Sequence, residues 1–559
     1  GNRDGGDGIS KLNPDEIESI NVWKGASASA LYGSQAANGV ILSNTKKGKA
    51  GVQKVTFSSS LTTERAISLP EYQNSYGMHP IEKNSWGEKS ELIKYDNVGD
   101  FFSSGVTAIN SLAFSTGNEK VQTYFSYANT YADGIIKTNN LQKHNISFRE
   151  TAGFFNNKLT LDANLNLMAQ TVKNRPTSGG YYMNPLVGLY TFPRGEDISV
   201  YKEHFEVYDQ ERNMQRQNWY TSSQDFEQNP YWLLYRAENK DKRMRAIASL
   251  TANLKVNNWL PLQARGTFDY VTDNYEQKMY ATTAPAIAGD NGRYIHYDYK
   301  ESLAYGDILA LVNHEWSNYS LQGALGTSIN TTNVSSLRLD SKTASLYYPN
   351  VFTVANIRMN QAAFVQQQQE ERRMLQSIFG MLQLGWRKSW FLEMTARNDW
   401  SSTLAFTNNS GFFYPSVGAS WVINNTLKLP RWLSYGKVRA SWSQVGNDLP
   451  VFISNTKPGS NDIIGAGGSI ITYSGSPLGH LKPEMSTSWE FGSEWKFFNY
   501  RADLDITYYH TNTRNQLFTL ATSAGAPYKS HIVNAGNIEN KGIEVTLGVV
   551  PVLSNDFYW

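Results

Sequence analysis

The sequence predicts a mostly β protein: one large antiparallel transmembrane β-barrel with a small α/β unit ahead of it. Three observations lead to this prediction. Apolar and polar residues alternate in paired segments, no apolar run approaches the roughly 18–20 residues of a membrane helix, and aromatic residues are abundant. The 559 residues include 33 Tyr, 25 Phe and 15 Trp but only 18 Pro. This composition is typical of strands and of the aromatic girdles that border a membrane.

The alternation is clearest in three β-hairpins, each with one apolar and one polar face. Their strands and turns are 145–154 and 159–167 around Asn156-Asn157, 246–256 and 262–270 around Asn257-Asn258, and 489–497 and 502–508 around Asn499. A soluble β-sandwich would also alternate, but strands of about 10 residues exceed the 5–6 that are usual in soluble sheets. Aromatic residues also lie beside the short turns, namely Phe154, Phe155, Trp259, Phe497, Phe498 and Tyr500. Strand length and aromatic placement together favour a membrane barrel.

The alternation also assigns the two faces of the barrel wall, because the reverse assignment would place carboxylates in hydrocarbon. We expect the following residues to face lipid: Leu161, Leu165, Leu250, Leu254, Leu504 and Ile506. We expect their polar neighbours to face the lumen: Asp162, Asn166, Thr251, Asn253, Asp503 and Asp505.

Long polar segments separate the hairpins and predict extracellular loops, as at 171–241 and 275–298. The charged run 366–373 has two interpretations, a partner-binding surface or a solvated loop that leads into a strand at Ile378. The solvated loop is the simpler one.

The first fifty residues differ from the rest. Asn13-Pro14-Asp15-Glu16 has the cap, the first-turn proline and the carboxylates that begin a helix. Strands are expected at 20–23 and 39–44, with a brief helix at 27–32 that ends at Gly33. We therefore divide the chain into a small α/β domain, 1–50, and a barrel domain, 51–559.

Composition excludes several classes of function. With 51 Lys+Arg against 49 Asp+Glu, the net charge of +2 gives no general attraction for nucleic acid. The absence of cysteine excludes disulfides, Cys-ligated metal sites and a thiol nucleophile. The 8 histidines show no zinc-protease spacing, and no Gly-x-Ser-x-Gly motif is present. We expect no enzyme activity, no metal and no cofactor.

Aromatic residues in the predicted loops are candidates for substrate contact, because rigid rings stack on sugars and on peptide side chains. The candidates are Tyr72, Tyr76, Trp86, Tyr181 and Tyr182. Packing within the loops or a place in the girdle explains each of them equally well.

Several segments resemble the SusC-like (SusC/RagA) branch of the TonB-dependent outer-membrane transporters. Residues 15–25 and 30–41 resemble the C-terminal half of the plug domain, and Ala36-Ala37-Asn38-Gly39 is the form found in this branch. The motif positions are Lys24, Gly25, Tyr32, Gly33, Asn38 and Gly39. Gln35 stands where the family more often has Arg. Further matching segments are 189–195, 228–232, 396–404, 414–417 and 481–484.

The resemblance implies a barrel of about 22 strands that is occluded by an internal plug. It also implies a SusD-like surface lipoprotein as a lid and coupling to the TonB–ExbB–ExbD system through an N-terminal TonB box. The expected location is the outer membrane of a Gram-negative bacterium, where the barrel is surrounded by outer-membrane lipid. The expected function is proton-motive-force-coupled import of a glycan or an oligopeptide. A passive porin-like channel and a non-transporting adhesion barrel are the alternatives. The chain is expected to be a fragment that lacks the TonB box, the front of the plug and the closing strands.

Overall fold

The structure is a computed structural model that describes most of the chain. The described residues are 14–23, 29, 33, 36, 39–79, 84–177, 182–221, 226–405, 407–453, 460–465, 468–473, 481–521, 523, 530–554, 557 and 559.

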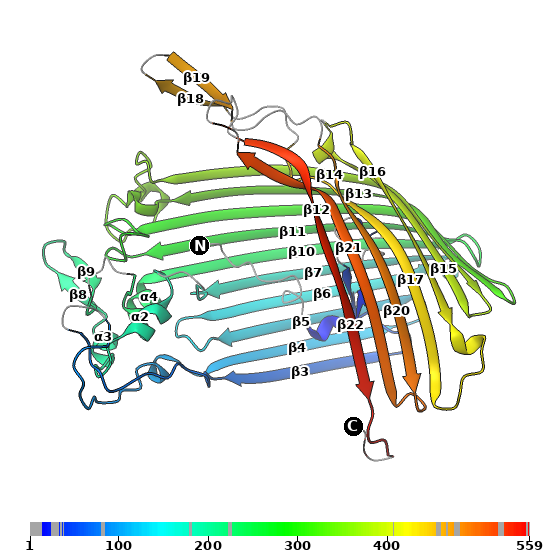
Figure 1. Cartoon of the computed structure of the whole chain (residues 1–559), viewed down its shortest axis with the longest axis horizontal. Coiled ribbons are helices and arrows are strands. Elements are labelled where there is room, and N and C mark those ends of the chain that lie inside the picture. The colour runs from blue at the N-terminus through cyan, green and yellow to red at the C-terminus, as the bar shows by residue number, and fades with distance from the viewer. Residues whose placement is uncertain are drawn as a thin grey trace.

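One antiparallel sheet of 16 strands dominates the fold and curls so that β22 crosses in front of the central strands (Figure 1). In sheet order the strands are β22 (Ser530–Val549), β21 (Ala502–Ala521), β20 (Glu484–Phe497), β17 (Leu433–Asn447), β16 (Gly411–Val422), β15 (Trp390–Ser401), β14 (Val365–Trp386), β13 (Tyr319–Asp340), β12 (Arg293–Glu315), β11 (Pro261–Met279), β10 (Ala237–Lys255), β7 (Leu159–Lys173), β6 (Asn140–Phe154), β5 (Val121–Asp133), β4 (Gly105–Gly117) and β3 (Gln53–Glu64). The prediction of a mostly β, antiparallel barrel-type fold is confirmed.

The three predicted hairpins are present with the predicted turns. Phe154 pairs with Leu159, Lys255 pairs with Pro261, and Phe497 pairs with Ala502. The strands are longer than the alternation alone indicated, with 19 residues each in β10 and β11. A tilted strand of about 9–11 residues crosses the hydrocarbon, so these strands extend well beyond it.

The predicted faces of the wall are confirmed. Leu250 is 52% exposed on the outer surface, and Leu165, Leu254 and Ile506 are exposed there as well. Leu161 and Leu504 share this face through their cross-strand partners Ala252 and Trp495.

The polar set faces inward. Asp162 binds Arg149, and Arg149 in turn contacts the N-terminal hairpin. Thr251 and Asn253 of β10 lie opposite Asp162 and Thr160 of β7 in the sheet, so they share the inner face with Asp162. Further along the sheet, Asp505 lies 3.5 Å from the guanidinium of Arg439. Asp503 shares the inner face of β21 with Asp505, and Asn166 shares the inner face of β7 with Asp162, because side chains two or four positions apart in a strand point the same way.

Connections are short at one rim of the sheet and long at the other. The β6–β7, β12–β13 and β14–β15 connections span only 155–158, 316–318 and 387–389, and we call this the turn rim. At the opposite loop rim, the 174–236 connection holds α2 (Pro185–Thr191), α3 (Ser199–Glu203), α4 (Pro230–Arg236), β8 (Glu206–Asp209) and β9 (Met214–Gln217). The 448–483 connection holds β18 (Ser460–Gly465) and β19 (Gly468–Tyr473), which form the hairpin at the top of Figure 1. Short 3-10 turns occur at η4 (Gly99–Phe101), η5 (Lys342–Ala344), η6 (Val354–Asn356), η7 (Ser402–Leu404) and η8 (Ile423–Asn425).

Two predicted loops are wrong in extent. Strands β11 and β12 continue to Met279 and from Arg293, so the loop predicted at 275–298 spans only 280–292. The charged run 366–373 belongs to β14 and is not a loop. Both errors have one cause: above the membrane a strand can be polar on both faces, and its alternation then disappears.

The N-terminal segment begins with η1 (Pro14–Glu16), followed by the antiparallel pair β1 (Ile17–Trp23) and β2 (Val40–Thr45). The expected helix is therefore a single 3-10 turn, and the strand begins at Ile17, three residues earlier than predicted. Cross-strand pairing of β-branched residues, such as Val22 with Ile41, favours the longer strand. The helix expected at 27–32 falls mainly outside the described residues. Among the described residues, no helix has the length and apolar character needed to cross a membrane.

The loops at the loop rim are packed structures. A cluster of buried residues joins α2, α4 and the segment before β4, and its members are Val98, Phe101, Leu189, Phe192, Ile198, Tyr231 and Leu234. Trp232 is fully buried and donates its Nε1–H to Thr283 Oγ1 at 3.0 Å. These loops therefore have a hydrophobic core of their own.

Candidate functional site

The internal hairpin, β1–β2, lies against the inner face of the sheet and contacts it through polar side chains. Just before β1, Ser126 Oγ of β5 donates to Glu16 Oε1 at 3.1 Å. Ser111 of β4 donates to the Asp15 carboxylate. Buried carboxylates need such donors to offset the loss of water. The start of the hairpin is thus attached to the β4–β5 wall.

The end of the hairpin is attached to the next part of the wall. Arg149 of β6 forms a bidentate ion pair with Asp162 of β7, with N–O distances of 3.0 Å. The remaining nitrogen, Nη1, donates to the Thr45 carbonyl at 2.9 Å and to Thr45 Oγ1 at 3.2 Å. Because the bidentate pair fixes the plane of the guanidinium, Arg149 presents a preorganised donor to the hairpin.

Gly48 explains how the chain passes from the hairpin to the wall. A Cβ at this position would lie 2.5 Å from the backbone nitrogen of Thr123. The chain can therefore cross β5 at this distance only with glycine here.

A second contact joins the N-terminal segment to β15. Gly33 has a φ of +76°, and a Cβ there would lie 3.3 Å from Arg397 Nη2. Arg397 is only 4% exposed. Its Nε donates to Asp399 Oδ1 at 2.7 Å and its Nη2 donates to Ser377 Oγ at 2.7 Å. We call Arg397 and its partners Asp399 and Tyr414 the seat, because Gly33 lies against the Arg397 guanidinium.

The seat is buried and internally paired. Asp399 is 0% exposed and also accepts a hydrogen bond from Tyr414 Oη at 2.6 Å. The Arg397 guanidinium lies 4.9 Å from the ring centre of Phe379, within cation–π range. A buried charge of this kind is tolerated only when it is paired and hydrogen-bonded. Removing any one partner would therefore leave a costly group behind.

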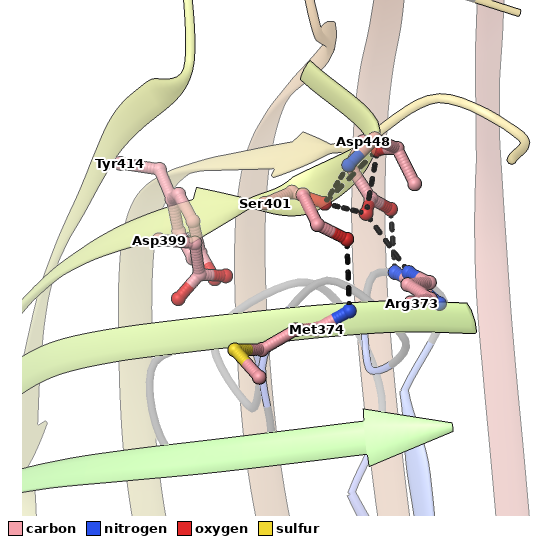
Figure 2. A network of polar contacts seen from close by, with 8 residues as sticks. Arg373, Met374, Asp399, Ser401, Tyr414 and Asp448 are labelled. Atoms are coloured by element: carbon pink, nitrogen blue, oxygen red, sulfur yellow. Dashed lines mark hydrogen bonds and ion pairs between the residues drawn. The ribbon is translucent and has the colours of Figure 1, made fainter. Parts of the chain in front are cut away.

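A neighbouring network fixes the start of the 448–483 loop at Asp448 (Figure 2). We call the two ends of this loop, at Asp448 and at Leu481-Lys482, its feet. Arg373 Nε of β14 donates to Asp448 Oδ2 at 2.9 Å, and Thr403 Oγ1 donates to the same oxygen at 3.2 Å. Ser401 also donates to Asp448. Since Arg397, Asp399 and Ser401 alternate along β15, the seat and the loop foot share one face of one strand.

The other foot of the same loop is held as well. Asn409 Nδ2 donates to the Leu481 carbonyl at 3.0 Å, and the Lys482 N–H donates to Asn534 Oδ1 at 2.7 Å. Below both feet lies a cluster of buried residues, Leu404, Phe412, Tyr414, Val445, Leu449 and Leu481. Tyr414 belongs to this cluster and to the seat.

Beyond the hairpin, a cavity of about 690 Å³ lies between Val22 and the wall. Its lining includes the polar side chains of Gln383, Glu393, Lys437, Arg439 and Glu490. The cavity therefore offers charged and amide groups beside apolar ones such as Val22 and Trp442, and it can contact a solute that has polar and apolar parts.

The structure describes two of the six predicted motif residues. Gly33 and Gly39 are described, and Gly39, with a φ of +99°, donates its N–H to the Ala36 carbonyl at 2.9 Å. Lys24, Gly25, Tyr32 and Asn38 lie outside the described residues. Their roles stay predictions.

The substrate-contact candidates occupy different surroundings. Tyr76 and Trp86 come together with ring centres 5.6 Å apart, and Trp86 is 65% exposed. Tyr72 instead packs under the guanidinium of Arg194 at 4.2 Å, and burial raises the pKa of its phenol. Tyr182 lies apart, its carbonyl accepting from Gln228 Nε2 at 2.5 Å. Tyr181 is outside the described residues, and substrate contact by all five stays a prediction.

Sequence reasoning missed the seat and the Asp448 network. The available signal was the pair Arg397 and Asp399, two opposite charges at i and i+2 on one face of a predicted strand. Their burial and their contact with Gly33 depend on residues far away in the sequence. The described residues contain no cluster of His, Asp and Glu that could hold a metal ion.

Comparison with known families identifies this arrangement. The profile described as "TonB dependent receptor-like, beta-barrel" matches residues 196–559, and the "TonB-dependent Receptor Plug Domain" matches residues 1–40. The chain belongs to the TonB-dependent receptor family. The plug match contains β1 and the first residue of β2. The sheet is barrel wall in the bacterial outer membrane, and the family consists of transporters and not enzymes.

Similar proteins agree with this placement. The chain is 24% identical to "TonB-dependent receptor SusC" of Bacteroides thetaiotaomicron over 99% of the chain and 56% of SusC. It is 24% identical to "TonB-dependent receptor P3" of Formosa agariphila, covering all of the chain and 55% of that protein. The chain therefore spans about half the length of these relatives. The predicted SusC/RagA-like TonB-dependent receptor is confirmed.

Solved structures show the same fold. The RagAB peptide importer in its open-open state superimposes with a TM-score of 0.75 at 18% identity, over 98% of this chain and 64% of that chain. The siderophore receptor PiuA from Acinetobacter baumannii gives a TM-score of 0.56 at 11% identity, over 96% of this chain and 67% of that chain. The receptor chain thus resembles RagAB in fold more closely than it resembles PiuA.

Proposed function

We propose that the whole protein imports a nutrient across the outer membrane, using the proton-motive force delivered by TonB–ExbB–ExbD through an N-terminal TonB box. The observation that carries the proposal is the N-terminal hairpin inside the barrel, held to the wall by polar contacts at Asp15, Glu16 and Thr45. Polar contacts of this kind exchange with water at a small net cost. A plug held in this way can be displaced by applied work without exposing a large apolar surface.

The substrate is proposed to be a glycan or an oligopeptide. Support comes from the polar side chains around the lumen cavity, Gln383, Glu393 and Arg439 among them, which match a hydrophilic solute. The RagAB structure, which has a similar fold, is described as a peptide importer, and this supports the oligopeptide alternative. Tyr76 and Trp86 are the candidates for first contact.

A SusD-like lipoprotein is proposed as the lid at the loop rim. Both feet of the 448–483 loop are fixed, by Asp448 and by Lys482, so this loop offers a firm base for a partner. We also propose that the plug ends near residue 50, because β2 ends at Thr45 and the wall begins with β3 at Gln53.

Deletion of TonB tests the proposal. Cells that express the full-length protein should accumulate a labelled nutrient only when TonB is present, although the nutrient still binds the cell surface without it. Equal uptake in both strains would indicate a passive channel, and binding without uptake in either strain would indicate an adhesion barrel. A binding screen of glycan and peptide libraries against the purified receptor–lid pair then separates the two substrate classes.

A further inference from the structure

An apolar pocket of about 730 Å³ lies at the turn rim, where β13, β14, β15 and β16 end. The ends of these strands and the turn before β13 provide the aromatic residues Trp316, Tyr319, Trp386 and Trp390. Leu384 and Leu392 lie one step further into the membrane. Ligand pockets in proteins have volumes of roughly 300–1,000 Å³, so this pocket can hold much of a small molecule.

The pocket opens on the lipid-facing side of the wall. Arg397 and Glu393 lie on the inner face of β15. Because side chains alternate along a strand, Trp390 and Leu392 point to the outer face. Trp386 pairs with both Tyr319 and Trp390, which places all three rings on the same face. Trp316, Trp386 and Trp390 are each more than 40% exposed although they are large apolar groups. Outer-membrane lipid is what surrounds this surface.

Two cations follow the pocket residue Trp386 in the chain, in the turn on the side away from the hydrocarbon. Arg387 and Lys388 form the β14–β15 turn and are both exposed. The Arg387 guanidinium lies 5.0 Å from the ring centre of Trp386. Neither cation forms an ion pair with any residue that the structure describes. The nearby residue Glu315 lies opposite Ser320 in the β12–β13 ladder. Its carboxylate therefore belongs to the inner face of the sheet. The outer side of this rim is therefore positively charged.

The same turn has an unfavourable choice of residues for its backbone. Arg387 and Lys388 have φ values of +51° and +53°, in the left-handed region. The β6–β7 turn places Phe155, Asn156 and Asn157 there, and the β20–β21 turn places Phe498, Asn499 and Tyr500 there, whereas Asn and Gly are the residues that such turns favour. Arg387 and Lys388 therefore carry a backbone cost that the R387N/K388G change would remove.

We propose that this pocket binds a glycerophospholipid of the periplasmic leaflet. Its phosphate pairs with Arg387 and Lys388, and an acyl chain lies among Trp386, Trp390 and Leu392. Turns of this barrel type face the periplasm, so cations at the rim and apolar rings beneath them match the order of a phospholipid from head to chain. Arginine suits phosphate in particular, through paired hydrogen bonds.

The test uses the intact receptor in detergent and titrates dioleoyl phosphatidylethanolamine while native mass spectrometry counts bound lipid. The double variant R387N/K388G supplies the preferred turn sequence, so the hairpin should fold at least as well as before. It should nevertheless bind the lipid at least about tenfold more weakly. Ala419→Leu narrows the pocket and keeps both cations, and it should weaken binding in the same direction.

The matched control is K120N/K158N, which removes two exposed cations from other short turns, at β4–β5 and β6–β7. This variant should bind lipid as the unmodified receptor does. Unchanged binding in R387N/K388G would overturn the proposal, and so would an equal loss in the control. A receptor dimer that dissociates in Ala419→Leu would also overturn it, because a second copy would then occupy the pocket.

Discussion

At the residue scale, single contacts decide how the plug meets the wall. Arg149 and Arg397 are both locked by an aspartate, Asp162 and Asp399, before they reach the plug. A guanidinium held in this way loses little conformational freedom when it contacts the plug. The wall is thus preorganised for the plug at both sites.

Gly33 provides the most specific test of the seat. Gly33→Ala puts a methyl group 3.3 Å from Arg397 in a backbone conformation with a φ of +76°. Gly51→Ala is a matched control, because Gly51 has a φ of +73° and open space around its Cβ. Both changes carry a backbone cost of about 1–2 kcal/mol, but only Gly33→Ala disturbs the seat. Limited proteolysis should therefore cleave the plug faster in Gly33→Ala, and equal rates would contradict the contact.

Asp399 and Tyr414 allow the seat to be divided into its parts. Asp399→Asn leaves the buried Arg397 without its charge partner and should destabilise the protein by about 3–5 kcal/mol. Tyr414→Phe keeps the ion pair, removes only the hydrogen bonding of the hydroxyl to this pair, and should cost about 1.5–3 kcal/mol. Urea unfolding of the receptor in lipid vesicles measures both. Tyr414→Phe keeps the ring in the hydrophobic cluster, so if it proves the more damaging change, the Tyr414 hydroxyl and not the ion pair would be the main source of stability.

At the element scale, the hairpins were predictable because their signal is local. Alternation near Leu161, Leu250 and Leu504 fixed strand type, face and turn, since lipid on one side and water on the other select side chains at every second position. Above the membrane that selection stops. The ends of β11, β12 and β14 were therefore missed, and the Gln366–Arg373 run was interpreted as a loop.

The wall register leads to a paired prediction on β10. Leu250→Arg places a charge in hydrocarbon and should cost roughly 2–4 kcal/mol. Thr251→Arg places the same side chain in the lumen opposite Asp162, where it can be paired. Folded and unfolded barrels migrate differently in SDS gel electrophoresis of unheated samples. The fraction of protein in the folded band should be lower for Leu250→Arg than for Thr251→Arg. Equal folding of the two variants would contradict the assignment of faces.

At the scale of the whole molecule, the sequence predicted the fold class and the family but not the site. Gly33 and the 396–404 segment were recognised only as resemblances, and nothing local indicated that one rests on the other. They are more than 350 residues apart, and their contact exists only once the sheet has curled around the plug. The Asp448 contact with Arg373 was invisible for the same reason.

If the proposed function is right, the plugged barrel needs energy to pass its substrate. The most direct measurement is the initial rate of labelled-nutrient uptake by cells that express the full-length receptor, before and after a protonophore collapses the proton-motive force. We predict that uptake stops when the force is lost while binding of the nutrient at the cell surface persists. Uptake that continues at the same rate without the force would contradict energy-coupled import.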